Sequence, residues 1–314
     1  MSKIKTAFEL ITKKDNNRAL QKAIADNITK IDMLQNLSDE AYLKLVYRLI
    51  FGRKLDLKNP KTFNEKLQWL KLYNRKPEYT LMVDKYEVKG YIAEQIGEEY
   101  VIPTLGVWDN FDDIDFDSLP NQFVLKCTHD SGGLVICKDK SNLDVTKALE
   151  KINKALTRRF YYFGREWPYK NVKPRIIAEK YMVDKTVDEL RDYKLFCFNG
   201  EPKVTLVCSG RFSEGGLRED FFDEQWNHIS IKRPGHPNEN TVIPKPINFE
   251  QMKMLAHQLF KSIPFLRVDF YEIDGKLYFG ELTFYPASGF EEFEPNKWDY
   301  EMGEWIHLPE RRMK

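Results

Sequence analysis

The sequence predicts an α+β protein, in which a helical N-terminal region precedes strands that pair mainly in antiparallel fashion. Between residues 38 and 97, apolar side chains recur at helical spacing between residues typical of helix ends. From residue 123 onward, apolar segments come in pairs joined by short turns, as at Asn199-Gly200 and Asp274-Gly275. Hairpins interspersed with helices are typical of the α+β class.

Three helices are expected in the N-terminal region. Ser38, followed by two acids, is a typical cap for the first helix. Thr62 and Glu65 form a capping-box pattern at the start of the second, and Gly97 ends a third that begins near residue 79. The Asp-rich segment 103–120 is expected to be a loop that connects this region to the strands.

The later elements follow from alternating apolar residues and turn residues. Two helices are expected near 143–156 and 249–263. The expected strands are 123–127, 134–138, 175–182, 193–198, 201–210, 267–273 and 276–283.

Composition excludes several classes of protein. The 314 residues suffice for about two domains, and the net charge of +1, from 49 basic and 48 acidic residues, gives no global field for nucleic acid. No apolar run is long enough to span a membrane, and the N-terminus lacks the apolar core of a signal peptide. The four cysteines have no CxxC spacing and are expected to be free thiols in a reducing compartment. We therefore expect a cytoplasmic protein without nucleic-acid partners or an integral membrane segment.

The hairpin around Asp274-Gly275 brings two acids together. Asp269 lies five positions before the turn and Glu281 six positions after it, so the two carboxylates should nearly face each other across the strands. Their apolar flanks indicate burial, and Arg267 alone is not expected to neutralise both. A divalent cation held by oxygen ligands resolves this repulsion, and Mg²⁺ usually arrives with phosphates. The alternative is a solvated sheet face with two acids on it.

A second motif offers a place for the phosphates. The loop "THDSGG" at 128–133 joins two apolar strands, and its glycines allow backbone N–H groups to fold over phosphate oxygens. Lys126 ends the preceding strand, where its ammonium group could reach a phosphate. Further on, a strand runs into 179–182, "EKYM", a suitable adenine hinge. Alone, the glycine loop favours an ordinary hairpin with a lysine on its rim, and the hinge segment is equally compatible with a strand that ends in a charged turn. No P-loop or GxGxxG motif is present.

Taken in order, these elements resemble the ATP-grasp superfamily. "RVDFYEIDGKLYFGELTFYPASGF" is similar to the metal-binding segment of D-alanine–D-alanine ligases, and "AEKYM" resembles the hinge of biotin carboxylases. "DKYEVKGYI" resembles the segment that contributes their first nucleotide-contacting lysine. The closer resemblance is to the TupA-like ATP-grasp family of bacterial surface-polysaccharide gene clusters, through "NPKTFNEKLQWLKLYNR", "LPNQFVLKCTHDSGG" and "DYKLFCFNGEPK".

The resemblance implies an ATP-grasp fold with ATP and Mg²⁺ as cofactors. Its expected parts are a helical region at 1–100, a small nucleotide-lid subdomain at 101–178 and an antiparallel-sheet catalytic subdomain at 179–314. The residues expected to bind the nucleotide are Lys85, Lys126, Ser131, Gly132, Gly133, Glu179, Lys180, Tyr181, Met182, Asp192 and Lys194. Asp269 and Glu281 are expected to ligate Mg²⁺, with Thr283 where many such ligases have Asn. Arg267 and Lys126 are the expected catalytic residues: Arg267 would neutralise charge that develops on the acyl centre, and Lys126 would contact the nucleotide phosphates.

The resemblance also implies a reaction. An ATP-dependent carboxylate–amine ligase would form an amide through an acylphosphate, joining an amine or amino acid to a uronic-acid-type carboxylate in capsular or cell-surface polysaccharide biosynthesis. The alternatives are a glycosyltransferase, for which the loop "DDIDFD" offers DxD motifs, and a nucleotide-binding protein without ligase activity. The segment 157–170 could hold a sugar carboxylate or simply pack on the core, and Ser288 could meet the second substrate. The oligomeric state is not predicted.

Overall fold

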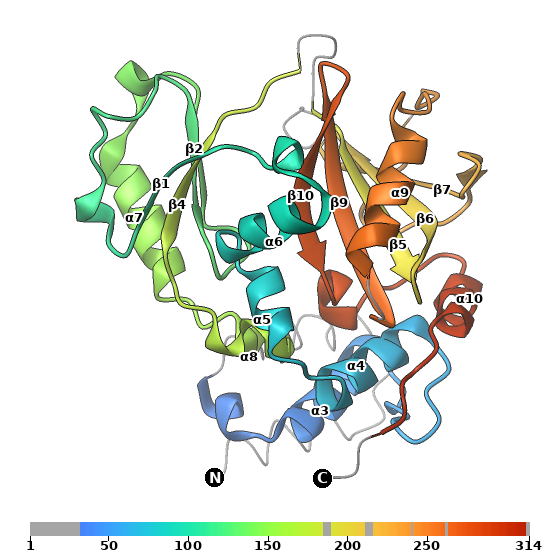
Figure 1. Cartoon of the computed structure of the whole chain (residues 1–314). Helices are drawn as coiled ribbons and strands as arrows, with labels where there is room; N and C mark the ends of the chain where they lie inside the picture. The colour runs from blue at the N-terminus through green and yellow to red at the C-terminus, as the bar shows by residue number, and fades with distance from the viewer. Residues whose placement is uncertain (1–31, 185–189, 211–215, 240, 261–262, 312–314) are drawn as a thin grey trace.

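The structure is a computed structural model that describes residues 32–184, 190–210, 216–239, 241–260 and 263–311 (Figure 1). Its α-helices are α3 (Asp39–Phe51), α4 (Phe63–Tyr73), α5 (Glu78–Val83), α6 (Glu87–Ile96), α7 (Val145–Leu156), α8 (Tyr161–Gly164), α9 (Phe249–Phe260) and α10 (Lys297–Trp305). Its 3-10 helices are η1 (Asp32–Asn36), η2 (Glu98–Tyr100), η3 (Phe111–Asp113), η4 (Lys140–Asn142), η5 (Trp167–Asn171) and η6 (Pro286–Gly289). Its strands are β1 (Thr104–Trp108), β2 (Phe123–Cys127), β3 (Leu134–Cys137), β4 (Ile176–Lys180), β5 (Asp192–Phe198), β6 (Glu201–Ser209), β7 (Arg218–Phe222), β8 (His228–Ile229), β9 (Phe265–Ile273) and β10 (Lys276–Thr283).

The strands form two sheets, one of four strands in the order β1-β4-β2-β3 and one of six in the order β10-β9-β5-β6-β7-β8. Every neighbouring pair of these strands is antiparallel, which confirms the predicted α+β class. In Figure 1 the smaller sheet and α7 lie on the left, the larger sheet and α9 on the right, and α5 and α6 between them.

Two hydrophobic cores underlie this arrangement. The larger core combines helices α3 to α6 with the six-stranded sheet and α9, and the smaller core lies between the four-stranded sheet and α7. Phe63 of α4 shows the connection, because its ring lies 4.9 Å from that of Phe265 in β9. The N-terminal helices are therefore packed into the same core as the larger sheet.

The predicted helix starts are confirmed. The Ser38 hydroxyl accepts from Ala41 N at 3.3 Å, and both hydrogen bonds of the Thr62–Glu65 capping box are present. The prediction of one continuous third helix is wrong, because this segment is divided into α5 and α6. Asp84 Oδ1 accepts from Tyr86 N at 2.8 Å, so its side chain satisfies the backbone at the start of a new helix. The break leaves Lys85 between the two helices, where its N–H donates to Thr128 O at 3.0 Å.

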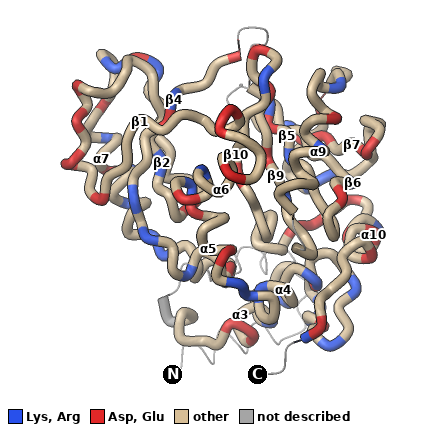
Figure 2. The backbone as a smooth tube through the Cα atoms, in the orientation of Figure 1, with Lys and Arg blue, Asp and Glu red and all other residues tan. Residues whose placement is uncertain are grey.

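The segment 103–120 is also not the continuous loop that was predicted, because β1 lies within it and pairs with β4. The predicted hairpins are present, and their turns use left-handed backbone at Asn199-Gly200 (φ 47° and 104°) and Asp274-Gly275 (φ 49° and 74°). The four cysteines are buried and free, as predicted. None of the helices in the described part of the chain is both long and apolar enough to cross a membrane. Basic and acidic residues are interspersed throughout (Figure 2).

Helix α10 packs tightly on the start of α4 at Gly303, and this contact gives a stability prediction. A Cβ atom at Gly303 would lie 2.2 Å from Lys61 O, so Gly303→Ala must push the two helices apart. We expect a loss of about 1–3 kcal/mol in the free energy of unfolding, measured by urea titration. The matched control is Gly90→Ala at an exposed position of α6, where nothing lies within 4 Å of the new Cβ. This change should stabilise the protein by about 0.5–1 kcal/mol. Equal effects at the two sites would contradict the packing argument.

Candidate functional site

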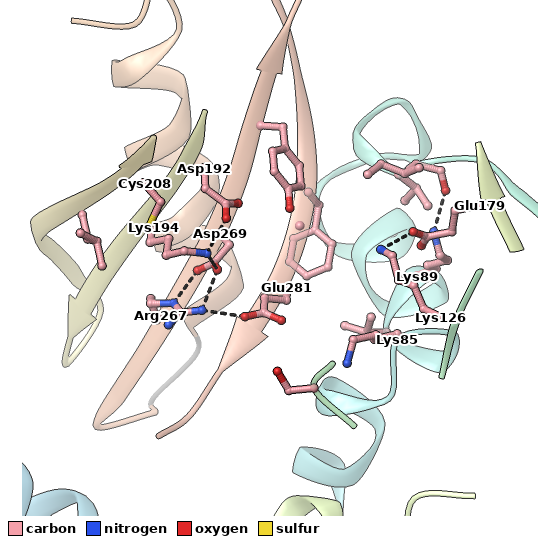
Figure 3. Close-up of a pocket in the computed structure, with 18 of the residues that line it drawn as sticks. Lys85, Lys89, Lys126, Glu179, Asp192, Lys194, Cys208, Arg267, Asp269 and Glu281 are labelled. Carbon is pink, nitrogen blue, oxygen red and sulfur yellow. Dashed lines mark hydrogen bonds and ion pairs between the residues drawn. The ribbon is translucent and has the colours of Figure 1, made fainter. Parts of the chain in front are cut away.

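A cavity of about 450 Å³ lies between the two sheets, lined by residues of α6, β2, β4, β5, β6, β7, β9 and β10 (Figure 3). The predicted site residues that line it are Lys85, Lys126, Ser131, Glu179, Asp192, Lys194, Arg267, Asp269 and Glu281. The predicted residues that are not part of its lining are Gly132, Gly133, Lys180, Tyr181, Met182 and Thr283. Residues far apart in the sequence therefore meet around one cavity.

One wall of the cavity is a charge cluster on the six-stranded sheet. Arg267 Nη2 donates to Asp269 Oδ2 at 2.7 Å and to Glu281 Oε1 at 2.6 Å. Lys194 lies opposite Asp269 in the register of β5 and β9, and its Nζ donates to Asp269 Oδ2 at 2.6 Å. The prediction that the two acids face each other is confirmed, but the argument that repulsion demands a metal is wrong, because Lys194 supplies the second positive charge.

A bulge in β10 shapes this wall. The register of β9 and β10 shifts between Phe279 and Leu282, so Gly280 and Glu281 together lie opposite Asp269. A Cβ atom at Gly280 would lie 3.1 Å from Asp269 O, so this position favours glycine. The bulge sets the Glu281 carboxylate beside Arg267, on the cavity side of the sheet (Figure 3).

The oxygen atoms of this wall fit a hard divalent cation. Within the described ranges, no group of three or more His, Cys, Asp or Glu side chains is arranged to hold a metal ion. The donors are the Asp269 and Glu281 carboxylates and the Thr283 hydroxyl, which donates to Glu281 Oε1 at 3.0 Å. Mg²⁺ often binds to one or two carboxylates while phosphates and water complete its shell, so this set is sufficient.

Glu281 is both ionised and accessible. Burial raises its pKa, but Arg267, Lys194 and Lys85 outweigh that effect and lower the pKa to about 2. Its side chain is 43% exposed, because it projects into the cavity. At neutral pH it is therefore a carboxylate that a ligand can reach. Burial lowers the pKa of Lys194, but the Asp269 carboxylate outweighs this and raises it above the ordinary value, so Lys194 is a cation.

The opposite wall is basic and surrounds Glu179. Lys89 Nζ lies 2.7 Å from Glu179 Oε1, and Lys126 forms an ion pair with the other carboxylate oxygen. Burial raises the pKa of Glu179, but Lys126 and Lys89 outweigh this and hold the pKa below its ordinary value. Lys85 Nζ donates to Asp130 O at 2.5 Å, which ties it to the 128–133 loop. The sequence interpretation missed Lys89, although its position four residues after Lys85 could have indicated it.

The glycines of the 128–133 loop have different surroundings. A Cβ atom at Gly133 would lie 2.5 Å from Ala155 Cβ, so this glycine allows the loop to pack on α7. Gly132 has a φ of 111°, a conformation that favours glycine. Ser131 is the loop residue that lines the cavity. The expectation that Gly132 and Gly133 cover phosphates stays a prediction.

The hinge residues lie at the end of β4. Lys180 N donates to Pro103 O at 3.0 Å, so its N–H is used within the protein, and the expectation that the Lys180 backbone holds adenosine stays a prediction. Tyr181 and Met182 follow β4 directly, and their role in binding adenosine stays a prediction. The segment 157–170 does not contribute to the cavity lining. Its Arg165 is 2% exposed and packs 4.6 Å from the Tyr42 ring, as the structural interpretation expected.

The sequence matches the TupA-like ATP-grasp family over residues 65–307. The chain belongs to this family. The match confirms the resemblance and the expected ATP-grasp fold, and ATP with Mg²⁺ are the usual cofactors of ATP-grasp proteins. Curated proteins yield no significant match to the sequence.

Solved structures of low sequence identity are also similar to this TupA-like ATP-grasp chain. The D-alanine–D-alanine ligase of Bacillus anthracis, complexed with ATP, is 18% identical, and the comparison covers 65% of this chain and 55% of that one, with a TM-score of 0.39. The corresponding ligase of Helicobacter pylori is 17% identical, with coverage of 78% and 69% and a TM-score of 0.42. The ATP-grasp ligase PsnB, complexed with minimal precursor, Mg and ADP, is 10% identical, with coverage of 83% and 66% and a TM-score of 0.38. The chain thus spans about half of the length of the first of these ligases.

Next to the cavity wall, the TupA-like chain has a buried lysine that supports a strained loop. Ala287 and Ser288 in η6 have φ values of 45° and 53°, which are unusual for residues other than glycine. Lys71 of α4 is fully buried, and its Nζ donates to Ser288 O at 2.6 Å and to Gly164 O at 2.7 Å. The Ser288 hydroxyl donates to Glu166 Oε1 at 2.5 Å, so it is engaged within the protein.

Glu281→Gln tests the charge cluster through acid stability. Because the pKa of Glu281 is lowered from 4.5 to about 2, its ionised form stabilises the fold above pH 4.5, and this contribution is lost as the pH falls toward 2. We expect the variant to be less stable at pH 7 by less than about 1 kcal/mol, since the side chain is partly exposed. The difference should vanish near pH 2 in urea titrations. A variant more stable than wild type at pH 7 would instead show that repulsion from Asp269 dominates.

Lys71→Met tests the buried lysine. Burial lowers the pKa of Lys71 from 10.5 to about 7, so the unfolded state binds a proton between these values that the folded state does not. Stability from this group therefore rises as the pH increases from 7 to 10.5. We expect a loss of about 1–3 kcal/mol at pH 7, from buried carbonyls that lose their donor. The gap should widen toward pH 10 in urea titrations, and a gap independent of pH would refute the lowered pKa.

Proposed function

We propose that this protein is an ATP-dependent carboxylate–amine ligase. The observation that supports this proposal is the pair of charged walls around one cavity. Lys85, Lys89 and Lys126 lie on one side, and Arg267 with Lys194 lies among acids on the other. Cations on both sides suit a triphosphate, and acids beside them suit its metal ion.

The nucleotide would lie between the two walls. Lys126 and Lys194 would contact phosphate oxygens from opposite sides, and the Ser131 loop would cover them. The apolar side chains of Val88, Ile102 and Phe279 line the same cavity and suit an adenine base. Glu179 and the backbone at Lys180, Tyr181 and Met182 are the proposed contacts to adenosine.

Asp269 and Glu281 would hold Mg²⁺, with the Thr283 hydroxyl beside them. When bound, the ion supplies Lewis-acid neutralisation of phosphate charge. Arg267 is held by hydrogen bonds to both acids, at 2.7 Å and 2.6 Å, which fixes its guanidinium group before any substrate arrives. A fixed, buried cation of this kind stabilises negative charge that develops at an acyl or phosphoryl centre.

The proposed reaction has two steps. A substrate carboxylate oxygen attacks the terminal phosphorus of ATP, which releases ADP and gives an acylphosphate. The nitrogen of an amine then attacks the acyl carbon, loses one proton and displaces phosphate, which leaves an amide. Family resemblance supports a uronic-acid-type carboxylate and an amino acid or amine as substrates, in capsular or cell-surface polysaccharide biosynthesis in the cytoplasm. The segment 157–170 adds no support, because none of it lines the cavity.

The alternative functions have less support. The acids of "DDIDFD" at 112–117 lie in η3 and the following loop and do not line the cavity, which disfavours a glycosyltransferase metal site there. A nucleotide-binding protein without ligase activity would not need Arg267 between two acids at the end of a basic cavity.

The experiment is incubation of the protein with ATP, Mg²⁺, a panel of uronic acids and their nucleotide derivatives, and mixed amino acids. We expect ADP, phosphate and a product whose mass is that of the two substrates less one water, detected by mass spectrometry. Asp269→Asn and Glu281→Gln should retain the fold and reduce the rate at least about 100-fold, because each removes a proposed metal ligand. A product that carries an added sugar and forms without ATP would favour the glycosyltransferase, and variants that turn over ATP at the wild-type rate would refute the metal assignment.

A further inference from the structure

The cavity continues beyond the phosphate-binding walls to a carboxylate on β7. Glu219 pairs in register with Cys208 of β6, and Cys208 pairs with Asp192 of β5. Residues paired in this way lie on the same face of a sheet, so Glu219 shares the cavity face with Asp192. From β9 to β7 there are three strand spacings, or about 14 Å. Glu219 thus lies at the end of the cavity remote from Arg267 and Asp269.

Glu219 is buried and incompletely paired. It is 3% exposed, and its Oε1 accepts from Arg233 Nη1 at 2.9 Å. Its other oxygen, Oε2, is covered from solvent and has no hydrogen-bond partner among the residues that the structure describes. A buried carboxylate oxygen without a donor is costly, so such a group in a cavity wall points to a donor from a ligand.

The charge balance at this end indicates the sign of that ligand. Arg233 is shared by two acids, because it also forms an ion pair with Glu291, and the Nδ1 of His236 lies 4.0 Å from Glu219 Oε1. Two carboxylates, of Glu219 and Glu291, thus share one guanidinium. The other end of the cavity has the opposite bias. The cations in its lining outnumber the carboxylates of Glu179, Asp269 and Glu281, and they are Lys85, Lys89, Lys126, Lys194 and Arg267. Anionic substrates are therefore favoured at the lysine end and cations at the Glu219 end.

We propose that Glu219 holds an ammonium group of the amine substrate, with Arg233 as the residue that positions its carboxylate. This inference rests on the proposed ligase function. Because Glu219 lies about three strand spacings from Asp269, the nitrogen it holds is not the one that reacts. The substrate is therefore an elongated amine with a second cationic nitrogen, in the class of aliphatic diamines and basic amino acids.

Binding of 1,5-diaminopentane to the full chain, measured by calorimetry, tests the site without requiring turnover. We expect pentylamine, which lacks the second ammonium group, to bind at least tenfold more weakly than the diamine. Glu219→Gln should weaken diamine binding at least tenfold, and it preserves an acceptor for Arg233. Glu250→Gln, at a carboxylate 68% exposed on α9, changes the net charge equally and should leave binding unchanged.

Several results would overturn the proposal. They are failure of wild type to bind the diamine, equal binding of diamine and pentylamine, and unchanged binding in a Glu219→Gln variant shown by circular dichroism to be folded. Failure of the ligase function would be seen separately: diamine binding that depends on Glu219, in a protein that forms no amide, would retain the site and refute the ligase. Amide formation with an unchanged KM for the amine in Glu219→Gln would retain the ligase function and refute the ammonium site.

Discussion

The contact between Arg267, Asp269, Glu281 and Lys194 is the constraint around which the larger sheet is built. Four charged groups lie on one face of a sheet whose other face packs on α9. Strand alternation makes this arrangement workable. In β5, Lys194 faces the cavity while Leu195, fully buried, belongs to the core. The cost of burying each charge is offset by an opposite charge within hydrogen-bonding distance.

The charge cluster also bears on the position of the smaller sheet. A wall with buried charges needs to be shielded from water without being filled by apolar side chains. The four-stranded sheet does this with a small core of its own, and it presents Lys126 and Glu179 toward the cavity. Two separate cores with polar faces toward each other leave a space of ligand size between them.

Much of this fold could be predicted from the sequence, because the governing interactions are local. The capping box at Thr62, the turns at Asn199-Gly200 and Asp274-Gly275, and the meeting of Asp269 with Glu281 depend on residues close in the chain. The division of the third helix depends on a single side chain, Asp84, which competes with helix continuation. Helix propensities give no strong preference between one continuous helix and two helices that meet at Asp84.

The parts of the site that could not be predicted depend on strand order. Strand β9 pairs with β5, although three strands, α9 and long connections separate them in sequence. Lys194 meets Asp269, and Glu219 joins the same face, only because of that order. The hairpin pattern that identified Asp269 and Glu281 contains no information about either neighbour. Lys194 could be assigned only through family resemblance, and Glu219 was missed.

The shared carboxylate of Glu179 has a mechanical consequence. Its two lysines come from different packing units, since Lys126 is on β2 of the small sheet and Lys89 is on α6, which packs into the larger core. The ion pair between Lys89 and Glu179 therefore joins the two packing units, as does the hydrogen bond from Lys85 N to Thr128 O. Any widening of the cavity between the two sheets would have to break this ion pair.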